Sequence, residues 1–176
     1  ARVTTVLFDD RYELLHDRVD ISRVKPMTSK EYYVRGCTAL LDAIGRTVAT
    51  LEAEQKDEEK ANTDKKVIFV ITTDGMENAS REYRADQVRK LIQKHEKEGW
   101  EFLFLGANMD AVAEAGKFGI REDRAVSFVN DSKGIALNYA EVGEAISVLR
   151  TEKSGKRMSG SWKNKIVRDY ESRKDG

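Results

Sequence analysis

Residues Lys65 to Asn78 read KKVIFVITTDGMEN and decide the fold, because they join a buried strand, a tight turn and an isolated acid. Val67 to Ile71 are all apolar and mostly β-branched, which predicts a central strand covered on both faces. Asp74 follows the carboxyl end of this strand, and Gly75 permits a sharp turn. Ligands of open α/β sheets bind beyond such strand ends, so Asp74 is a candidate site residue. The alternative is that Asp74 and Asn78 only make the turn and start the next helix.

The charge of the chain is balanced. Its 176 residues include 31 Lys plus Arg and 31 Asp plus Glu, which gives a formal net charge of zero. A neutral chain has no overall field to attract a polyanion, so we expect neither nucleic acid nor a membrane as a partner. The single cysteine, Cys37, excludes an internal disulfide framework and suits a reducing compartment. We therefore expect a cytoplasmic protein.

The order of the segments predicts the fold class. Strand-like and helical segments alternate from Val67 to Leu149, which favours a parallel sheet. Two β-rich runs, Arg2 to Phe8 and Tyr12 to His16, flank a short polar turn and predict an antiparallel hairpin. The expected fold is a doubly wound, mostly parallel α/β sheet with helices on both faces and the hairpin at its edge, over residues 1–150. Residues 151–176 are expected to form a basic, partly docked tail.

The apolar spacing also predicts the individual elements. Strands are expected at residues 67–71, 100–105 and 124–129, and helices at 38–51, 84–98, 110–118 and 131–149. Thr38 is the expected N-cap of the first helix, and Gly99 is the expected stop of the second. His95 lies on the apolar face of that second helix, where we expect it to flank the core and not to bind a ligand.

Oxygen-bearing side chains occur in three segments that should meet at one rim of the sheet. These segments are Asp9-Asp10, Thr38 and Thr73-Asp74. Carboxylate and hydroxyl oxygens suit Mg²⁺, which keeps several waters where a protein supplies few ligands. The residue types therefore fit a magnesium site, although strand-end acids and helix-capping threonines are also common for structural reasons.

Other chemistries have less support. The sequence has no G-x-x-x-x-G-K-[ST] motif and no G-x-G-x-x-G after a strand, so these phosphate-binding loops are absent. The two histidines, His16 and His95, lie in segments that suggest no Ser-His-Asp or Cys-His pair. Cys37 has no obvious base beside it, and is expected to be either exposed near the rim or a small packed residue.

Several segments together resemble a von Willebrand factor type A domain. They read V-T-T-V-L-F-D-D at 3–10, R-G-C-T-A-L-L-D-A-I-G at 35–45 and V-I-F-V-I-T-T-D-G-M-E-N at 67–78. That family builds a metal-ion-dependent adhesion site from an Asp-x-Ser-x-Ser loop, a threonine before a helix and an aspartate in a T-D-G turn. Thr38 and Asp74 resemble that threonine and that aspartate by position. The resemblance implies a Rossmann-like protein-interaction module, and F-L-G-A-N-x-D at 104–110 resembles a bacterial or phage-associated cytoplasmic branch.

The Asp-x-Ser-x-Ser loop and the strand before it are missing from this sequence. In the family that first strand is central, so the resemblance implies an N-terminally truncated domain with two unpaired strand edges. Three arrangements would fill the gap: the edges close on one another, a strand is swapped in from another copy, or the missing piece lies outside this sequence. Because the loop supplies most of the family's protein ligands, Mg²⁺ binding is expected to be weak or absent.

Two alternatives differ from a metal-dependent binding module. A Mg²⁺-dependent phosphoesterase or nuclease would use the strand-end acids Asp9, Asp10, Asp74 and Asp110, which must then approach a shared metal pair. A purely structural interaction domain would have lost the metal altogether. The neutral charge argues against the nuclease, so the expected protein is not an enzyme. It is a module in which a partner's carboxylate completes the coordination of Mg²⁺ at the rim.

Overall fold

The computed structural model describes residues 1–26, 36–58, 66–152 and 156–173, and the chain divides into two compact units. Unit 1 comprises Ala1–Asp57 with Met76–Arg84, and unit 2 comprises Glu58–Gly75 with Ala85–Gly176. The described residues form two separate sheets, an antiparallel pair and a three-stranded parallel sheet. The expected α/β composition, with a parallel sheet and an antiparallel hairpin, is therefore confirmed.

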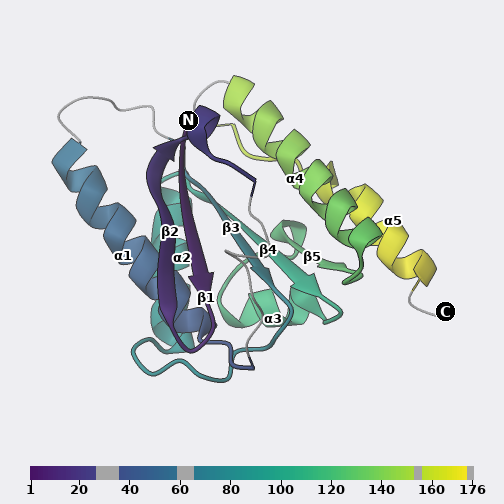
Figure 1. Cartoon of the computed structure of the whole chain (residues 1–176), viewed down its shortest axis with the longest axis horizontal. Helices are drawn as coiled ribbons and strands as arrows, with labels where there is room; N and C mark the ends of the chain where they lie inside the picture. The colour runs from purple at the N-terminus through teal and green to yellow at the C-terminus, as the bar shows by residue number, and fades with distance from the viewer. Residues whose placement is uncertain (27–35, 59–65, 153–155, 174–176) are drawn as a thin grey trace. The chain divides into compact units, whose positions relative to one another are not determined.

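Unit 1 contains the hairpin. Strand β1 (Arg2–Phe8) pairs antiparallel with β2 (Tyr12–Asp20), and the 3-10 turn η1 (Ile21–Arg23) follows (Figure 1). The register runs from Phe8 opposite Tyr12 to Arg2 opposite Asp20. The second strand is longer than the expected run to His16. The hairpin forms a sheet of its own and is not hydrogen-bonded to the edge of the parallel sheet.

Helix α1 (Leu40–Glu58) also belongs to unit 1. Leu40, Ile44 and Val48 are almost completely buried and recur at the spacing of one helical face. The expected helix at 38–51 is thus present, although it begins two residues after Thr38. Its expected charged end continues as helix to Glu58, and residues 59–65 lie outside the described part of the chain.

The parallel sheet of unit 2 has the strand order β3, β4, β5. Its strands are β3 (Ile68–Thr73), β4 (Glu101–Ala107) and β5 (Ala125–Phe128). All seven residues of β4 are buried, whereas Val70 of β3 is 36% exposed. The expectation of a central strand at 67–71 is therefore wrong for this sheet. An apolar run indicates that a strand is buried, but the number of its neighbours is set by pairing distant in sequence.

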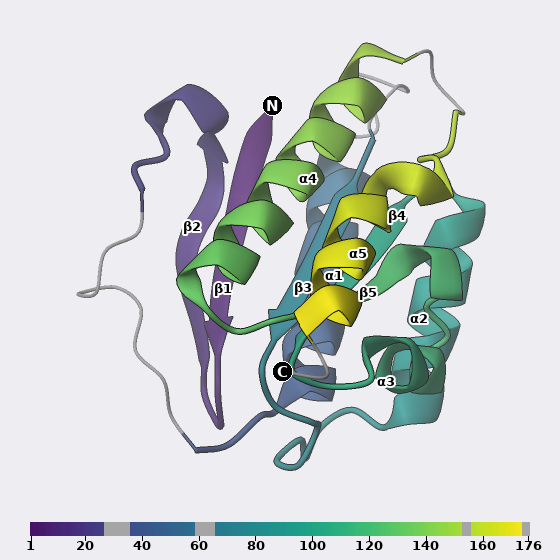
Figure 2. The same ribbon diagram turned by 90° about the vertical axis from the view of Figure 1, so that its right-hand side faces the viewer.

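Helices cover both faces of this sheet within unit 2. They are α2 (Ala85–Lys97), α3 (Ala111–Lys117), α4 (Ser132–Thr151) and α5 (Asn164–Arg173), with 3-10 turns η2 (Glu122–Arg124) and η3 (Gly160–Lys163). Figure 2 shows α4 and α5 side by side in front of the strands, and Leu105 of β4 packs in one cluster with Val142 and Ile166 of these helices. On the other face, the Phe104 ring lies 6.3 Å from that of Phe118, just after α3.

The C-terminal segment belongs to unit 2 and ends in a helix that the sequence pattern did not indicate. Trp162 and Ile166 are buried in the cluster that joins β4, β5, α4 and α5. The Trp162 Nε1–H also donates a hydrogen bond of 2.9 Å to the carbonyl of Asp123. These two residues were among the anchors expected for the tail, and residues 153–155 and 174–176 lie outside the described part.

Most helix boundaries in unit 2 follow the local signals. Asp110 and Asp131 cap α3 and α4, and their carboxylates accept the N–H groups of Ala113 and Gly134 at 3.0 and 2.7 Å. Gly99 has φ +95°, a left-handed conformation that favours glycine, just after α2. None of the helices in the described ranges is long and apolar enough to cross a bilayer.

Candidate metal site

Asp74 lies in unit 2, directly after the carboxyl end of β3. The turn is made by its neighbour: the hydroxyl of Thr73 donates to the carbonyl of Gly75 at 2.8 Å and accepts the Gly75 N–H at 3.2 Å. Asp74 is exposed, and its carboxylate has no hydrogen bond or ion pair with any described residue. The next helix begins only at Ala85, so Asp74 does not cap α2, and the side-chain hydrogen bonds of the turn come from Thr73.

Thr38 lies in unit 1, two residues before α1. Its N–H donates to the Asn78 side-chain oxygen at 2.9 Å, and its carbonyl accepts the Asn78 N–H at 3.0 Å. The main chain of Thr38 is thus held on both sides. Its hydroxyl makes no hydrogen bond within the described ranges, so the expectation that it caps α1 is wrong.

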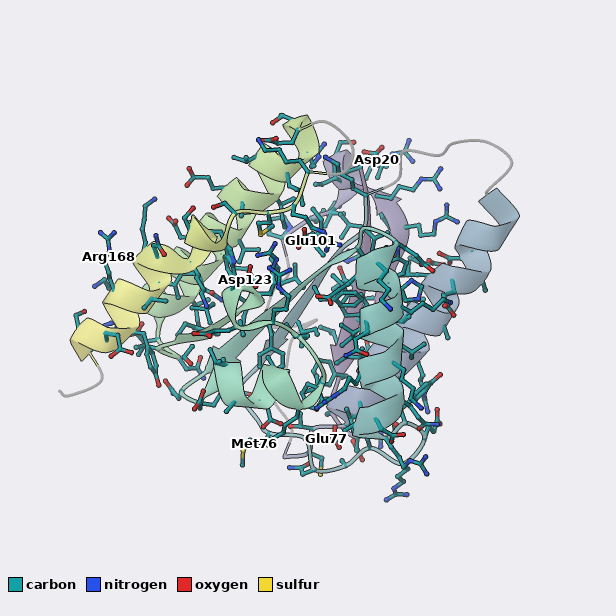
Figure 3. The ribbon with its side chains drawn as sticks, turned by 180° about the vertical axis from the view of Figure 1, so that it is seen from behind. Asp20, Met76, Glu77, Glu101, Asp123 and Arg168 are labelled. Carbon is teal, nitrogen blue, oxygen red and sulfur yellow. The ribbon has the colours of Figure 1, made fainter. Side chains whose placement is uncertain are left out.

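Side chains from residues 76–84 supply the cap of α1. The Glu77 carboxylate accepts the N–H of Leu41 at 3.0 Å, and the Ser80 hydroxyl accepts the N–H of Asp42 at 3.1 Å. The Ser80 hydroxyl in turn donates to Glu77 at 2.8 Å. Glu77, labelled in Figure 3, thus contacts both the start of α1 and Ser80. Sequence reasoning missed this arrangement, because the cap and the helix start lie 36 residues apart and no local spacing connects them.

Asp42, in the first turn of α1, in turn accepts hydrogen bonds from the main chain of residues 76–84. Its carboxylate accepts the N–H groups of Arg81, Glu82 and Tyr83 at 2.8, 2.9 and 2.8 Å. Burial alone would raise the pKa of Asp42, but these three hydrogen bonds outweigh it, and the pKa is lowered. The segment 76–84 is therefore fixed to the start of α1 by two carboxylates that face several N–H groups each.

Two of the other acids considered for metal binding, Asp9 and Asp110, have structural partners. The Asp9 carboxylate accepts the N–H of Arg11 at 2.6 Å, and the Asp9 carbonyl accepts the N–H of Ala39 at 2.6 Å, which fixes the hairpin turn beside Thr38 in unit 1. Asp10 is exposed in the same turn. Asp110 caps α3 in unit 2. The described residues contain no group of three or more His, Cys, Asp or Glu side chains arranged to hold a metal ion.

His95 is buried, whereas Cys37 is exposed. His95 is buried, its Nδ1 lies 2.7 Å from a carboxylate oxygen of Glu98, and its ring stacks on Trp100 at 4.1 Å. The expected core position of His95 is confirmed. Cys37, the residue before Thr38, is exposed, so it is not a packed core residue.

Comparison of the chain with protein-family models, with curated proteins and with solved structures gave no match. The geometry described above therefore carries the functional argument. In unit 1, Thr38 has a hydroxyl on a main chain that Asn78 holds, and in unit 2, Asp74 has an exposed carboxylate at a strand end. A hard cation such as Mg²⁺ takes oxygen ligands of both kinds.

Proposed function

We propose that the chain is a protein-interaction module of the von Willebrand factor type A kind, with an incomplete metal-ion-dependent adhesion site at Thr38 and Asp74. The proposal includes a doubly wound, Rossmann-like sheet without its first strand and a cytoplasmic protein of the bacterial or phage-associated branch. One observation supports it most. The structural tasks that usually employ a threonine before a helix and an aspartate after a strand are performed here by Glu77, Ser80 and Thr73.

The two proposed ligands have different roles. Asp74 binds Mg²⁺ directly or through a water, and the Thr38 hydroxyl supplies a neutral oxygen. In sequence, Asp74 precedes Asn78 by four residues, and Asn78 holds the main chain of Thr38. A carboxylate from the partner protein completes the coordination. Because two protein ligands leave most positions to water, this chain binds the metal weakly, far above the micromolar range.

Self-association is a second part of the proposal. Within the described residues β3 pairs only with β4, which leaves one edge of β3 without a hydrogen-bonded strand. Ile68–Thr73 contains no charged residue and no proline, the usual devices that protect a strand edge. A strand from a second copy, exchanged by swapping, is the occupant we propose for this edge.

The metal site is tested with Mn²⁺, which broadens NMR signals of nearby nuclei. At millimolar Mn²⁺ we expect broadening of the amide signals around Thr38 and Asp74. Thr38→Ala and Asp74→Asn should both reduce it. Thr50→Ala is the matched control for the hydroxyl, because Thr50 is exposed on α1 and bonds its own helix. Asp10→Asn is the matched control for the carboxylate.

Three outcomes would contradict the proposal. One is broadening that Asp74→Asn leaves unchanged. Another is broadening centred on Asp10 or Asp110, which would favour the phosphoesterase or nuclease. The third is the absence of any localised broadening at millimolar Mn²⁺. A micromolar site would show that the chain holds ligands beyond the two assigned.

A further inference from the structure

A second polar region lies in unit 2, at the C-terminal end of α2. It is a hollow of about 450 Å³, and its lining side chains are polar or charged: Gln93, Glu96, Lys97, Arg121 and Arg157. They come from the last turns of α2, from the residue before η2 and from the segment that follows α4. Three cations therefore face one carboxylate in a single hollow.

The two guanidinium groups are held in place by fixed partners. Arg121 donates from Nε and Nη2 to the two carboxylate oxygens of Asp123 at 2.9 and 2.5 Å, and Arg157 donates from Nη2 to the main-chain carbonyl of Glu96. A second guanidinium nitrogen of Arg157, Nη1, lies 4.0 Å from the Glu101 carboxylate, beyond hydrogen-bond distance. Each guanidinium is thus oriented on one edge and keeps N–H donors that have no partner in the described ranges.

The two acids next to the arginines of the hollow, Asp123 and Glu101, are shared with a third arginine. Asp123 and Glu101, both labelled in Figure 3, also bind the buried Arg124 at 2.7 Å each. Each of these two carboxylates therefore serves more than one guanidinium.

The polar groups of the three other lining side chains have no partner among the described residues. Gln93, Lys97 and the carboxylate of Glu96 make no hydrogen bond or ion pair with the described residues. Burial raises the pKa of Glu96, although Arg121 and Arg157 oppose this shift. A basic last turn is common in helices, because cations interact well with the negative end of the helix dipole. That explanation covers Lys97, but it does not bring two oriented arginines from other segments to the same hollow.

We propose that this hollow binds a small organic phosphate, with the phosphate group on Arg121, Arg157 and Lys97. Arginine forks and lysine ammonium groups are the usual protein partners of phosphate oxygens. The volume exceeds that of a bare phosphate ion, so the organic part of the ligand lies beside Gln93. Glu96 opposes the bound anion by like-charge repulsion and limits the affinity. This site is separate from Thr38 and Asp74 and does not depend on the function proposed for them.

The test uses the full chain, labelled with ¹⁵N and titrated with ribose 5-phosphate, ribose and inorganic phosphate. We expect amide shifts at residues 93–97, 121 and 157 with ribose 5-phosphate, weaker shifts with inorganic phosphate and none with ribose. Lys97→Gln and Arg157→Gln should each weaken binding about fivefold or more, as expected for loss of a charge-assisted hydrogen bond at an exposed site. Glu96→Gln should tighten binding, because it removes the repulsion and keeps the shape.

Lys90→Gln is the matched control, because Lys90 is exposed on α2 and does not line the hollow. It should leave the affinity unchanged, as should Asp74→Asn. Equal weakening by Lys90→Gln would show a diffuse charge effect and overturn the proposal. It would also be overturned by weaker binding in Glu96→Gln, by equal affinity for inorganic phosphate, or by the absence of localised shifts. The tighter binding expected of Glu96→Gln cannot arise from a folding defect.

Discussion

Several carboxylates among the described residues accept main-chain N–H groups. Asp42 accepts three such groups from a segment far away in the sequence, and Glu77 accepts one from Leu41 and two from its own neighbours Ala79 and Ser80. A carboxylate in this setting stabilises the fold only while it is ionised, because the protonated form accepts hydrogen bonds poorly. Asp74 differs from both, since its carboxylate is exposed and has no partner in the described part of the chain. This difference separates a structural acid from a candidate ligand.

Replacement of Asp42 by asparagine should lower the free energy of unfolding at neutral pH by about 1–2 kcal/mol, because the neutral amide accepts the three N–H groups less strongly. The pKa of Asp42 in the folded protein lies below its ordinary value of 3.8. Its contribution is therefore complete above that pH and is lost as the pH falls through the folded-state pKa. Urea unfolding between neutral and acid pH measures both effects.

Asp10→Asn is the matched control for this prediction, because Asp10 is exposed in the hairpin turn. It should leave both the stability and its pH dependence nearly unchanged. If Asp42→Asn is as stable as the wild type at neutral pH, the three hydrogen bonds do not contribute as described.

At the scale of elements, one buried ion pair joins three segments of unit 2. Arg124, at the end of η2, donates from Nε to Glu101 of β4 at 2.7 Å and from Nη2 to the carbonyl of Met158 at 2.7 Å. The Met158 N–H donates a hydrogen bond of 3.2 Å to the Glu101 carboxylate. Asp123 holds the remaining edge of the guanidinium at 2.7 Å. This network fixes the segment after α4 against the start of the central strand.

Removal of one partner should therefore be costly. Arg124→Met removes the guanidinium that binds the buried carboxylate of Glu101 at 2.7 Å and should lower the free energy of unfolding by about 3–5 kcal/mol. The double variant Glu101→Leu with Arg124→Met should recover most of the loss, because no buried charge remains. Chemical unfolding of the two single variants and the double variant completes the cycle. Additive losses in the double variant would show that the two side chains do not act as a pair.

At the scale of the whole molecule, each unit has its own sheet, and the chain passes between the units more than once. Residues 76–84 lie in sequence between β3 and α2 of unit 2, yet they are fixed to α1 of unit 1 through Asn78, Glu77 and Ser80. The edge of β3 and the candidate ligand Asp74 both lie just before this change of unit. The proposed strand exchange between copies belongs to this scale, because it changes the assembly and leaves the chemistry of Asp74 intact.

Val70→Lys should weaken self-association in sedimentation-velocity experiments at high protein concentration, because a charge on an apolar strand edge opposes pairing. Val112→Lys is the matched control. Val112 is exposed on α3 to nearly the same extent, 38% against 36% for Val70. A monomeric wild type at every concentration would contradict the proposed exchange, and so would an equal effect of the two lysine variants.

Agreement between sequence and structure is closest where a signal is local. The strand at Arg2–Phe8, the helix that begins next to Asp131 and the helix stop at Gly99 were all predicted correctly. In contrast, Val112 of α3 is apolar and yet 38% exposed. In a helix as short as Ala111–Lys117, the apolar spacing defines a face only loosely.

The sequence by itself determined most of the strands and helices between residues 1 and 151, because backbone preferences and apolar periodicity act over a few residues. It also singled out Thr38 and Asp74 as oxygen-bearing residues at element ends. Only the tertiary structure decided that β4 is the central strand of its sheet and that Trp162 and Ile166 join its core. It likewise assigned the capping of α1 to Glu77 and Ser80. These outcomes depend on pairing and packing between residues far apart in the chain, and no local pattern specifies such contacts.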